Sequence, residues 1–153
     1  MGERLIVSRP MPTNRALSPL DGTIGTWNLT GSHPYMPGRT LRGRVTFERI
    51  EGGAFIRMHS KMEEPEIPEG FALFGTDDDH GTCTMLYFDV RGVSRLYDVT
   101  FHEDGFTWSR DSAKFAQRFR VTFGEDGRTM ESVGTMKKEG GEWEPDLRLS
   151  YVR

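Results

Sequence analysis

The sequence is poor in cysteine, and Cys83 is the only one among its 153 residues. A single cysteine cannot form an internal disulfide, which fits a protein of the reducing cytosol. Because Cys83 stands inside an apolar run, we expect a small core residue rather than a reactive thiol. A chain of this length can bury one core without a disulfide or metal staple.

Long hydrophobic runs are also missing from the N-terminal part. Residues 1–20 hold one short apolar run, at 5–7, which is too short for a signal sequence or a membrane span. We therefore expect a cytoplasmic protein with no membrane partner.

An excess of basic charge is absent. The 20 lysines and arginines are interspersed with 23 acidic residues, which gives a net charge of −3. Because no basic stripe is present, nucleic acid is not expected as a partner.

Histidine is scarce, and the four present, His33, His59, His80 and His102, show no metal-ligand spacing. His80 follows three aspartates without the spacing of a calcium loop, so we expect a solvated turn there. A nucleophile elbow and a phosphate loop are also missing. The sequence therefore assigns no metal ligand, no cofactor and no catalytic residue.

Turn residues and alternating apolar residues are plentiful instead. The 18 glycines and eight prolines separate short segments in which apolar and polar residues alternate, as in half-buried strands. The expected strands are at 24–31, 40–50, 54–62, 71–75, 82–90, 93–102, 106–110, 115–123, 128–138 and 142–152.

Tight turns between these segments predict an antiparallel meander, and a meander this long tends to close because closure removes unpaired edges. We therefore predict an all-β fold: a single closed, antiparallel, up-and-down β-barrel of about ten strands, with its first and last strands paired. Residues 1–20 are expected to form an N-terminal arm, either extended or with a short helix near 14–17, and residues 21–153 the barrel domain. The Pro-rich stretch 32–38 is expected to cross one barrel mouth as a lid or a plain connection.

A barrel wider than eight strands is expected to enclose a cavity, although a filled core is the alternative. Aromatic side chains, with tyrosines as polar handles, would line it. His59 is included because it could meet His102 across the barrel. The candidate ligand-binding residues are Trp27, Met58, His59, Tyr87, Arg95, Tyr97, Trp108, Phe119 and Tyr151.

Arg95 is the most informative of these residues. It shares the alternation of Val93, Tyr97 and Val99, so it is expected to point inward if they do. A buried arginine needs a carboxylate, a water cluster or a ligand anion as partner. The alternative is an arginine at a strand end that reaches solvent beside Asp89 or Asp98.

Several motifs, in order, carry a family resemblance. They are Gly25-Thr26-Trp27, the block from Phe47-Glu48 to Gly52-Gly53, Tyr87-Phe88-Asp89 with Gly92, Arg118-Phe119, and Trp143 with Asp146 and Tyr151. Across residues 18–153 the chain resembles an uncharacterised bacterial lipocalin-like family of calycin-type β-barrels. That family is distantly similar to fatty-acid-binding proteins and nitrobindin. The resemblance implies a calycin-like barrel, a small apolar ligand, and a basic residue, Arg148 or Arg153, packed on Trp27.

The distant relatives differ from this chain at their binding motifs. Nitrobindin-type barrels bind haem through a late histidine, and no histidine follows His102 here. Fatty-acid-binding proteins hold a carboxylate with Arg-x-Tyr on the last strand. Here the spacing from Arg148 to Tyr151 puts the two side chains on opposite faces.

The sequence leaves more than one function open. The first is a cytosolic barrel that binds a small apolar or weakly acidic molecule, as a monomer or homodimer. The second is an enzyme that performs acid–base chemistry, such as an isomerase or cyclase, with His59 or a Tyr–Asp pair. The third is an interaction protein with a filled barrel.

Overall fold

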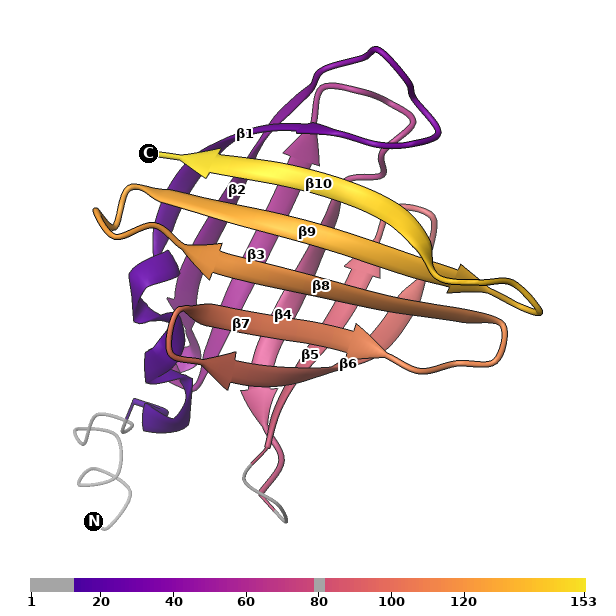
Figure 1. Ribbon diagram of the computed structural model, residues 1–153. Helices are drawn as coiled ribbons and strands as arrows, with labels where there is room; N and C mark the ends of the chain where they lie inside the picture. The colour runs from indigo at the N-terminus through magenta and orange to yellow at the C-terminus, as the bar shows by residue number, and fades with distance from the viewer. Residues whose placement is uncertain (1–12, 79–81) are drawn as a thin grey trace, which may run out of the picture.

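Ten antiparallel strands form a closed barrel in the computed structural model, which describes residues 13–78 and 82–153 (Figure 1). The strands are β1 (Gly25–Ser32), β2 (Leu41–Ile50), β3 (Phe55–Met62), β4 (Gly70–Thr76), β5 (Cys83–Asp89), β6 (Ser94–His102), β7 (Gly105–Arg110), β8 (Phe115–Phe123), β9 (Thr129–Lys138) and β10 (Glu144–Val152). Each strand pairs with its neighbour in sequence, and β1 pairs with β10. This confirms the predicted all-β barrel and the pairing of its first and last strands.

A 3-10 helix, η1 (Arg15–Thr23), lies against one end of the barrel (Figure 1). The side chain of Asn14 caps it by accepting a hydrogen bond from the Ala16 amide at 3.1 Å. Leu17 and Leu20 are fully buried and belong to the core. The helix is longer than the short turn expected near 14–17. Residues 1–12 of the expected arm lie outside the described residues, as does His80 in the expected turn.

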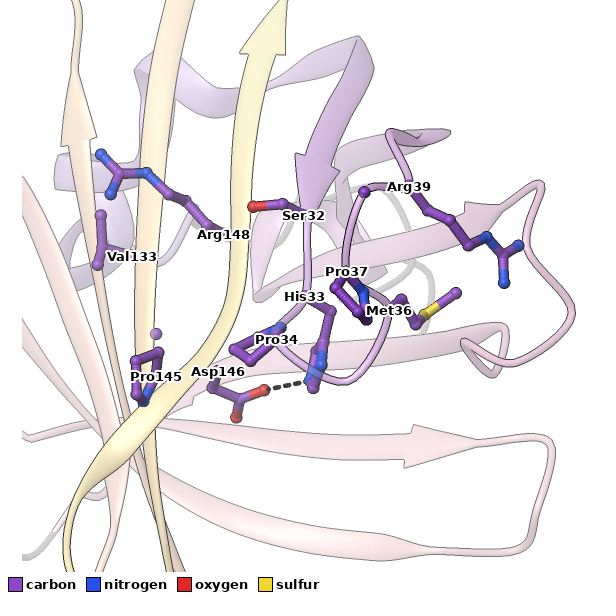
Figure 2. A pocket seen from close by; sticks show the side chains of 12 residues that line it. Ser32, His33, Pro34, Met36, Pro37, Arg39, Val133, Pro145, Asp146 and Arg148 are labelled. Atoms are coloured by element: carbon purple, nitrogen blue, oxygen red, sulfur yellow. Dashed lines mark hydrogen bonds and ion pairs between the residues drawn. The ribbon is translucent and has the colours of Figure 1, made fainter.

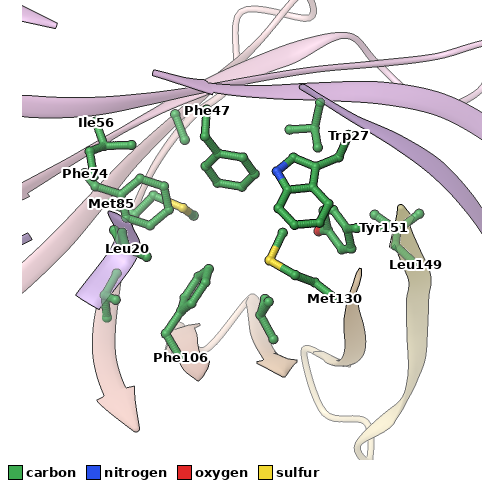
Figure 3. Close-up of a cluster of buried hydrophobic side chains, with 14 of the residues drawn as sticks. Leu20, Trp27, Phe47, Ile56, Phe74, Met85, Phe106, Met130, Leu149 and Tyr151 are labelled. Atoms are coloured by element: carbon green, nitrogen blue, oxygen red, sulfur yellow. The ribbon is translucent and has the colours of Figure 1, made fainter. Parts of the chain in front are cut away.

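The core fills the helix end of the barrel interior (Figure 3). It combines inward residues from eight of the ten strands, as alternation requires: Trp27, Phe47, Ile56, Phe74, Met85, Phe106, Met130, Leu149 and Tyr151. The indole of Trp27 donates to the Thr23 carbonyl at 2.8 Å. The guanidinium of Arg153 lies 4.0 Å from the Trp27 ring centroid. The packing of a basic residue on this tryptophan, implied by the family resemblance, is thus confirmed for Arg153.

The opposite end of the barrel is formed by loops at 33–40, 63–69, 90–93, 111–114 and 139–143. At the helix end, by contrast, β2 and β3 are joined by the short 3-10 turn η2 (Glu51–Gly53), where a hairpin turn was expected. None of the helices in the described part of the chain is both long and apolar enough to cross a membrane.

Strand β10 carries an irregularity near the loop end. Pro145 pairs with Thr135, but Arg148 pairs with Val133, so the register shifts by one residue between them. Such a bulge places two residues opposite one and reverses the alternation beyond it. As a result Asp146 is buried while Pro145 is exposed, whereas an unbroken alternation with Leu149 and Tyr151 would turn Pro145 inward.

Candidate functional site

The loop end of the barrel interior is lined by polar and aromatic side chains. On β5 to β8 they lie on the same inward face as the core residues, two or four positions nearer the loop end. We call them the mouth residues, and they are Tyr87, Asp89, Arg95, Tyr97, Trp108, Arg110, Phe115, Gln117 and Asp146. The interior is therefore apolar at the helix end and mixed, aromatic and charged, at the mouth.

A chain of hydrogen bonds crosses the mouth from the first loop to β6. The ring Nε2 of His33 lies 3.1 Å from Oδ1 of Asp146, and Gln117 donates to Oδ2 of the same carboxylate at 2.9 Å. The hydroxyl of Tyr97 donates to the Gln117 side-chain oxygen. Burial raises the pKa of Tyr97, an effect that the nearby Arg95 and Arg110 oppose. The tyrosine is therefore a neutral donor at neutral pH.

His33 uses both ring nitrogens inside the protein. Its Nδ1 accepts a hydrogen bond from the Tyr35 amide at 3.0 Å, so in the neutral ring the proton sits on Nε2 and is donated to Asp146. A ring with both nitrogens occupied has no free position for proton transfer. The pair therefore fixes the loop to β10.

Tyr87, Asp89 and Arg91 form a second polar group at the end of β5. The Tyr87 hydroxyl donates to Asp89 at 2.7 Å, and Arg91 donates to both carboxylate oxygens, at 2.7 and 3.1 Å. These hydrogen bonds, first those from Arg91, lower the pKa of Asp89 to about 2, while burial and the carboxylate raise the pKa of Tyr87. Both groups thus keep one protonation state across the neutral range.

Aromatic rings form one wall of the mouth. Trp108 stacks on Phe119 with ring centroids 4.1 Å apart, and Tyr97 meets Trp108 edge-on at 4.8 Å. Tyr87 lies edge-on to Tyr97 at 6.3 Å. Met36 and Ile67, from two of the loops, also pack against the core from this end. The wall offers flat apolar contacts next to polar groups.

Two arginines stand on this wall without an acidic partner. Arg95, half-buried, is paired in register with Tyr87 and lies 5.0 Å from the ring centroid of Phe115. Arg110 is paired in register with Gln117. Within residues 13–78 and 82–153, neither guanidinium forms an ion pair. Arg95 thus faces inward among aromatic rings, as its alternation predicts.

The Pro-rich loop covers a pocket of about 270 Å³ beside β9 and β10 (Figure 2). Pro34, Met36, Val133 and Pro145 give it apolar walls, and the His33–Asp146 pair lies at its edge. Farther along the loop, Tyr35 donates to Glu144 at 2.6 Å and accepts from Lys138. The loop is therefore held to the β9–β10 hairpin by side chains from both of its strands.

The predicted site residues fall into separate groups. Tyr87, Arg95, Tyr97 and Trp108 come together at the mouth, and Phe119 stacks beneath Trp108. The remaining inward ones belong to the core at the helix end or pack against it: Trp27, Met58 and Tyr151.

His59 is the exception among the predicted residues, because it lies on the outer face of β3. Its neighbours Met58 and Ser60 take the inward positions, and its Nε2 lies 2.8 Å from a carboxylate oxygen of Glu69. His102 bonds to Thr107 at 2.8 Å, so the two histidines do not meet across the barrel. The expected interior position of His59 is therefore corrected.

The sequence prediction also missed residues of the site, among them Arg110, Gln117, Asp146 and His33. Arg110 and Gln117 share the alternation of Trp108 and Phe119, so that pattern could have found them. Asp146 was hidden by the bulge in β10, and His33 lies in a loop where alternation carries no information.

Metal-binding and thiol chemistry find little support in the geometry. Among the described residues, no group of three or more histidine, cysteine or acidic side chains could hold a metal ion. Cys83 is buried, as expected, and burial raises the pKa of its thiol to about 12. Since the thiolate is the nucleophile, this cysteine is inert near neutral pH.

A scan of known protein families finds no match to the sequence, and a search of curated proteins finds none either. Solved structures do share the fold. Rv2717c from M. tuberculosis matches with a TM-score of 0.63 and 14% identity, over 93% of this chain and 99% of that one. The S-type phycobiliprotein lyase CPES from Guillardia theta matches with a TM-score of 0.59 and 14% identity, over 88% and 89%. At this identity the likeness shows the fold alone, a calycin-like barrel.

Proposed function

We propose that the barrel binds a small, mostly apolar molecule at its loop end, and that Arg95 and Arg110 receive an acidic or carbonyl group of that molecule. The observation that carries this proposal is the pair of inward arginines without an acidic partner among the described residues. An arginine held among aromatic rings needs an anion or water, and a ligand carboxylate fits its planar fork. The phycobiliprotein lyase that shares the fold is compatible with a ligand-binding role but does not define the ligand.

The rest of the mouth supports the same function. The aromatic wall of Tyr97, Trp108 and Phe119 suits an apolar body, and apolar walls with few polar groups are typical of ligand sites. The pocket under the Pro-rich loop lies at the same end, on the outer side of β9 and β10 where Val133 is exposed, and the hydrogen-bond chain from His33 to Tyr97 runs from its edge into the mouth. The loop is therefore the proposed entrance.

The enzyme alternative gains little from the Tyr87–Asp89 pair. A general acid or base works best when its pKa lies near the working pH. Here the pKa of Tyr87 is raised and that of Asp89 is lowered to about 2, so both move away from neutrality. The pair supports the wall of the mouth, which favours binding over acid–base chemistry.

Calorimetric titration with a matched pair of probes tests the proposal. Dodecanoate and dodecanol share an apolar chain and differ in the charged group, so wild-type protein should bind dodecanoate more tightly. Arg95→Met should weaken dodecanoate binding about 10- to 150-fold, because a charged hydrogen bond contributes about 1.5–3 kcal/mol, and should leave dodecanol binding unchanged. The control is Arg42→Met, which removes an exposed arginine from the outer face of β2.

Two results would contradict the proposal. One is equal binding of dodecanoate and dodecanol by the wild-type protein. The other is an Arg95→Met variant that loses both probes equally while it keeps the wild-type melting temperature. Since losing a half-buried unpaired charge should not harm the fold, the melting curve separates loss of binding from loss of structure.

A further inference from the structure

The outer surface of the barrel carries an apolar patch across four neighbouring strands, β3 to β6. We call it the outer apolar patch, and its members are Phe55, Phe71, Leu73, Leu86, Phe88 and Leu96. The largest exposed fractions are 57% for Leu96, 44% for Leu86 and 42% for Phe55. A contiguous apolar surface of this kind marks an interaction site, whereas single exposed apolar residues do not.

The strand register arranges the patch in parallel rows. One row runs Arg57, Leu73, Leu86, Leu96 from β3 to β6. The next runs His59, Phe71, Phe88, Ser94, and its two phenylalanine rings stack with centroids 5.0 Å apart. About the seam between β4 and β5, leucine therefore faces leucine and phenylalanine faces phenylalanine.

From this symmetry we infer that a second copy of the chain covers the outer apolar patch, with a two-fold axis running along the seam between β4 and β5. That axis places β4 of each copy on β5 of the other, so Phe71 meets Phe88 and Leu73 meets Leu86. Two sheets that pack face to face keep their strands roughly aligned, as this arrangement requires. All ten strands are already paired, so association must use a face rather than an edge.

Charge complementarity at the sides of the patch supports the same axis. It places β3 of each copy over β6 of the other. Arg57 then faces Leu96, and Asp98 is the next outward residue on the same strand. Arg57 lies over the Phe71 ring at 5.5 Å and donates one hydrogen bond to Glu48 at 3.3 Å, which leaves further donors free. Asp98 is exposed and forms no ion pair within the described part of the chain. An axis perpendicular to the strands would instead place β3 over β3, so Arg57 would lie near Arg57 of the other copy.

Sedimentation velocity of the purified full chain at micromolar concentration tests this dimer. The wild-type protein should sediment as a dimer, and Leu86→Glu should weaken the dimer at least about tenfold, since central apolar contacts dominate interfaces. Leu86 is largely exposed, so circular dichroism and melting should stay unchanged. Val152→Glu is the matched control, because Val152 is 51% exposed on the outer face of β10, away from the patch.

Mixing two charge variants tests the axis. Arg57→Asp alone and Asp98→Arg alone each bring like charges together twice in a homodimer, and each should be monomeric or weakened. An equimolar mixture should form a heterodimer, visible by native mass spectrometry, because every facing pair is then of opposite charge. A monomeric wild-type chain, or a dimeric Leu86→Glu variant, would overturn the interface, and failure of the mixture to pair would overturn the axis.

Discussion

Individual side chains set the charge that the mouth presents to a ligand. Asp89 forms an ion pair with Arg91, and Asp146 accepts hydrogen bonds from His33 and Gln117. Both carboxylates thus have partners within the protein, whereas neither Arg95 nor Arg110 forms an ion pair among the described residues. The mouth should therefore prefer an anionic group over a cationic one, and the preference rests on single residues rather than on the net charge of −3.

The acid stability of the protein should depend on Asp89. Its pKa is lowered from 3.8 to about 2 in the fold, chiefly by hydrogen bonds from Arg91. A carboxylate with a lowered pKa stabilises the fold above its unfolded pKa, and this stabilisation is lost as pH falls through the folded pKa. It amounts to about 2 kcal/mol. Denaturant titrations at several pH values should show that Asp89→Asn is less stable than the wild type near neutrality. Its free energy of unfolding should also change less between about pH 4 and pH 2.

Asp111→Asn is the control for this measurement. Asp111 is 84% exposed and lies 3.8 Å from Arg118, so its removal should leave the acid profile unchanged. An Asp89→Asn profile that runs parallel to the wild-type profile between about pH 4 and pH 2 would show that the Arg91 pair does not set acid stability.

At the scale of elements, alternation and turn residues predict most of what the structure shows. Strands β1 to β9 lie within one or two residues of their expected bounds, because each has one buried face and ends at a turn. Val45, Phe47 and Ile56 show this, because each alternates with less buried neighbours along its strand and is itself buried.

Two features could not be predicted from alternation, for physical reasons. A bulge changes the alternation within one strand, and local composition does not reveal how many residues oppose each other across two strands. Pro145, which cannot donate to the ladder, was the available signal in β10. The partner of His33 depends on contacts between residues 113 positions apart, which periodicity cannot supply.

The Pro-rich loop should become mobile when His33 is removed. His33→Ala loses the hydrogen bond to Asp146, which ties the loop to β10, and the hydrogen bond from the Tyr35 amide, which lies inside the loop. Hydrogen exchange of the Tyr35, Met36, Gly38 and Arg39 amides should become faster by about a factor of five to ten, equivalent to roughly 1 kcal/mol. The melting temperature should change little, since the loop lies outside the core.

Arg39→Met provides a comparison within the same loop. Arg39 pairs with Glu66, but both side chains are about half exposed, and such pairs contribute little. Exchange of the same amides should then stay near the wild-type rate. If His33→Ala also left this rate unchanged, the proposed role of His33 as the loop attachment would be wrong.

For the whole molecule, closure of the barrel depends on one seam. Strand β1 joins β2 on one side and β10 on the other, so the first and last strands complete the ring. Opening that seam would expose two unpaired edges, which favour aggregation. The interior is thereby divided between a packed helix end and a polar mouth, and both depend on the ring staying closed.

Gly31 is where the closure leaves no room for a side chain. It pairs with Leu149 across the seam, and a β-carbon at Gly31 would lie 2.2 Å from the Arg148 carbonyl oxygen and 2.7 Å from Cδ2 of Leu149. Because the first of these is backbone, relief requires β1 to move away from β10. Gly31→Ala should therefore cost about 3 kcal/mol or more in denaturant titration, with aggregation visible by light scattering. Gly22→Ala, where nothing lies within 4 Å, should unfold like the wild-type chain, and equal midpoints for the two variants would show that the seam tolerates separation.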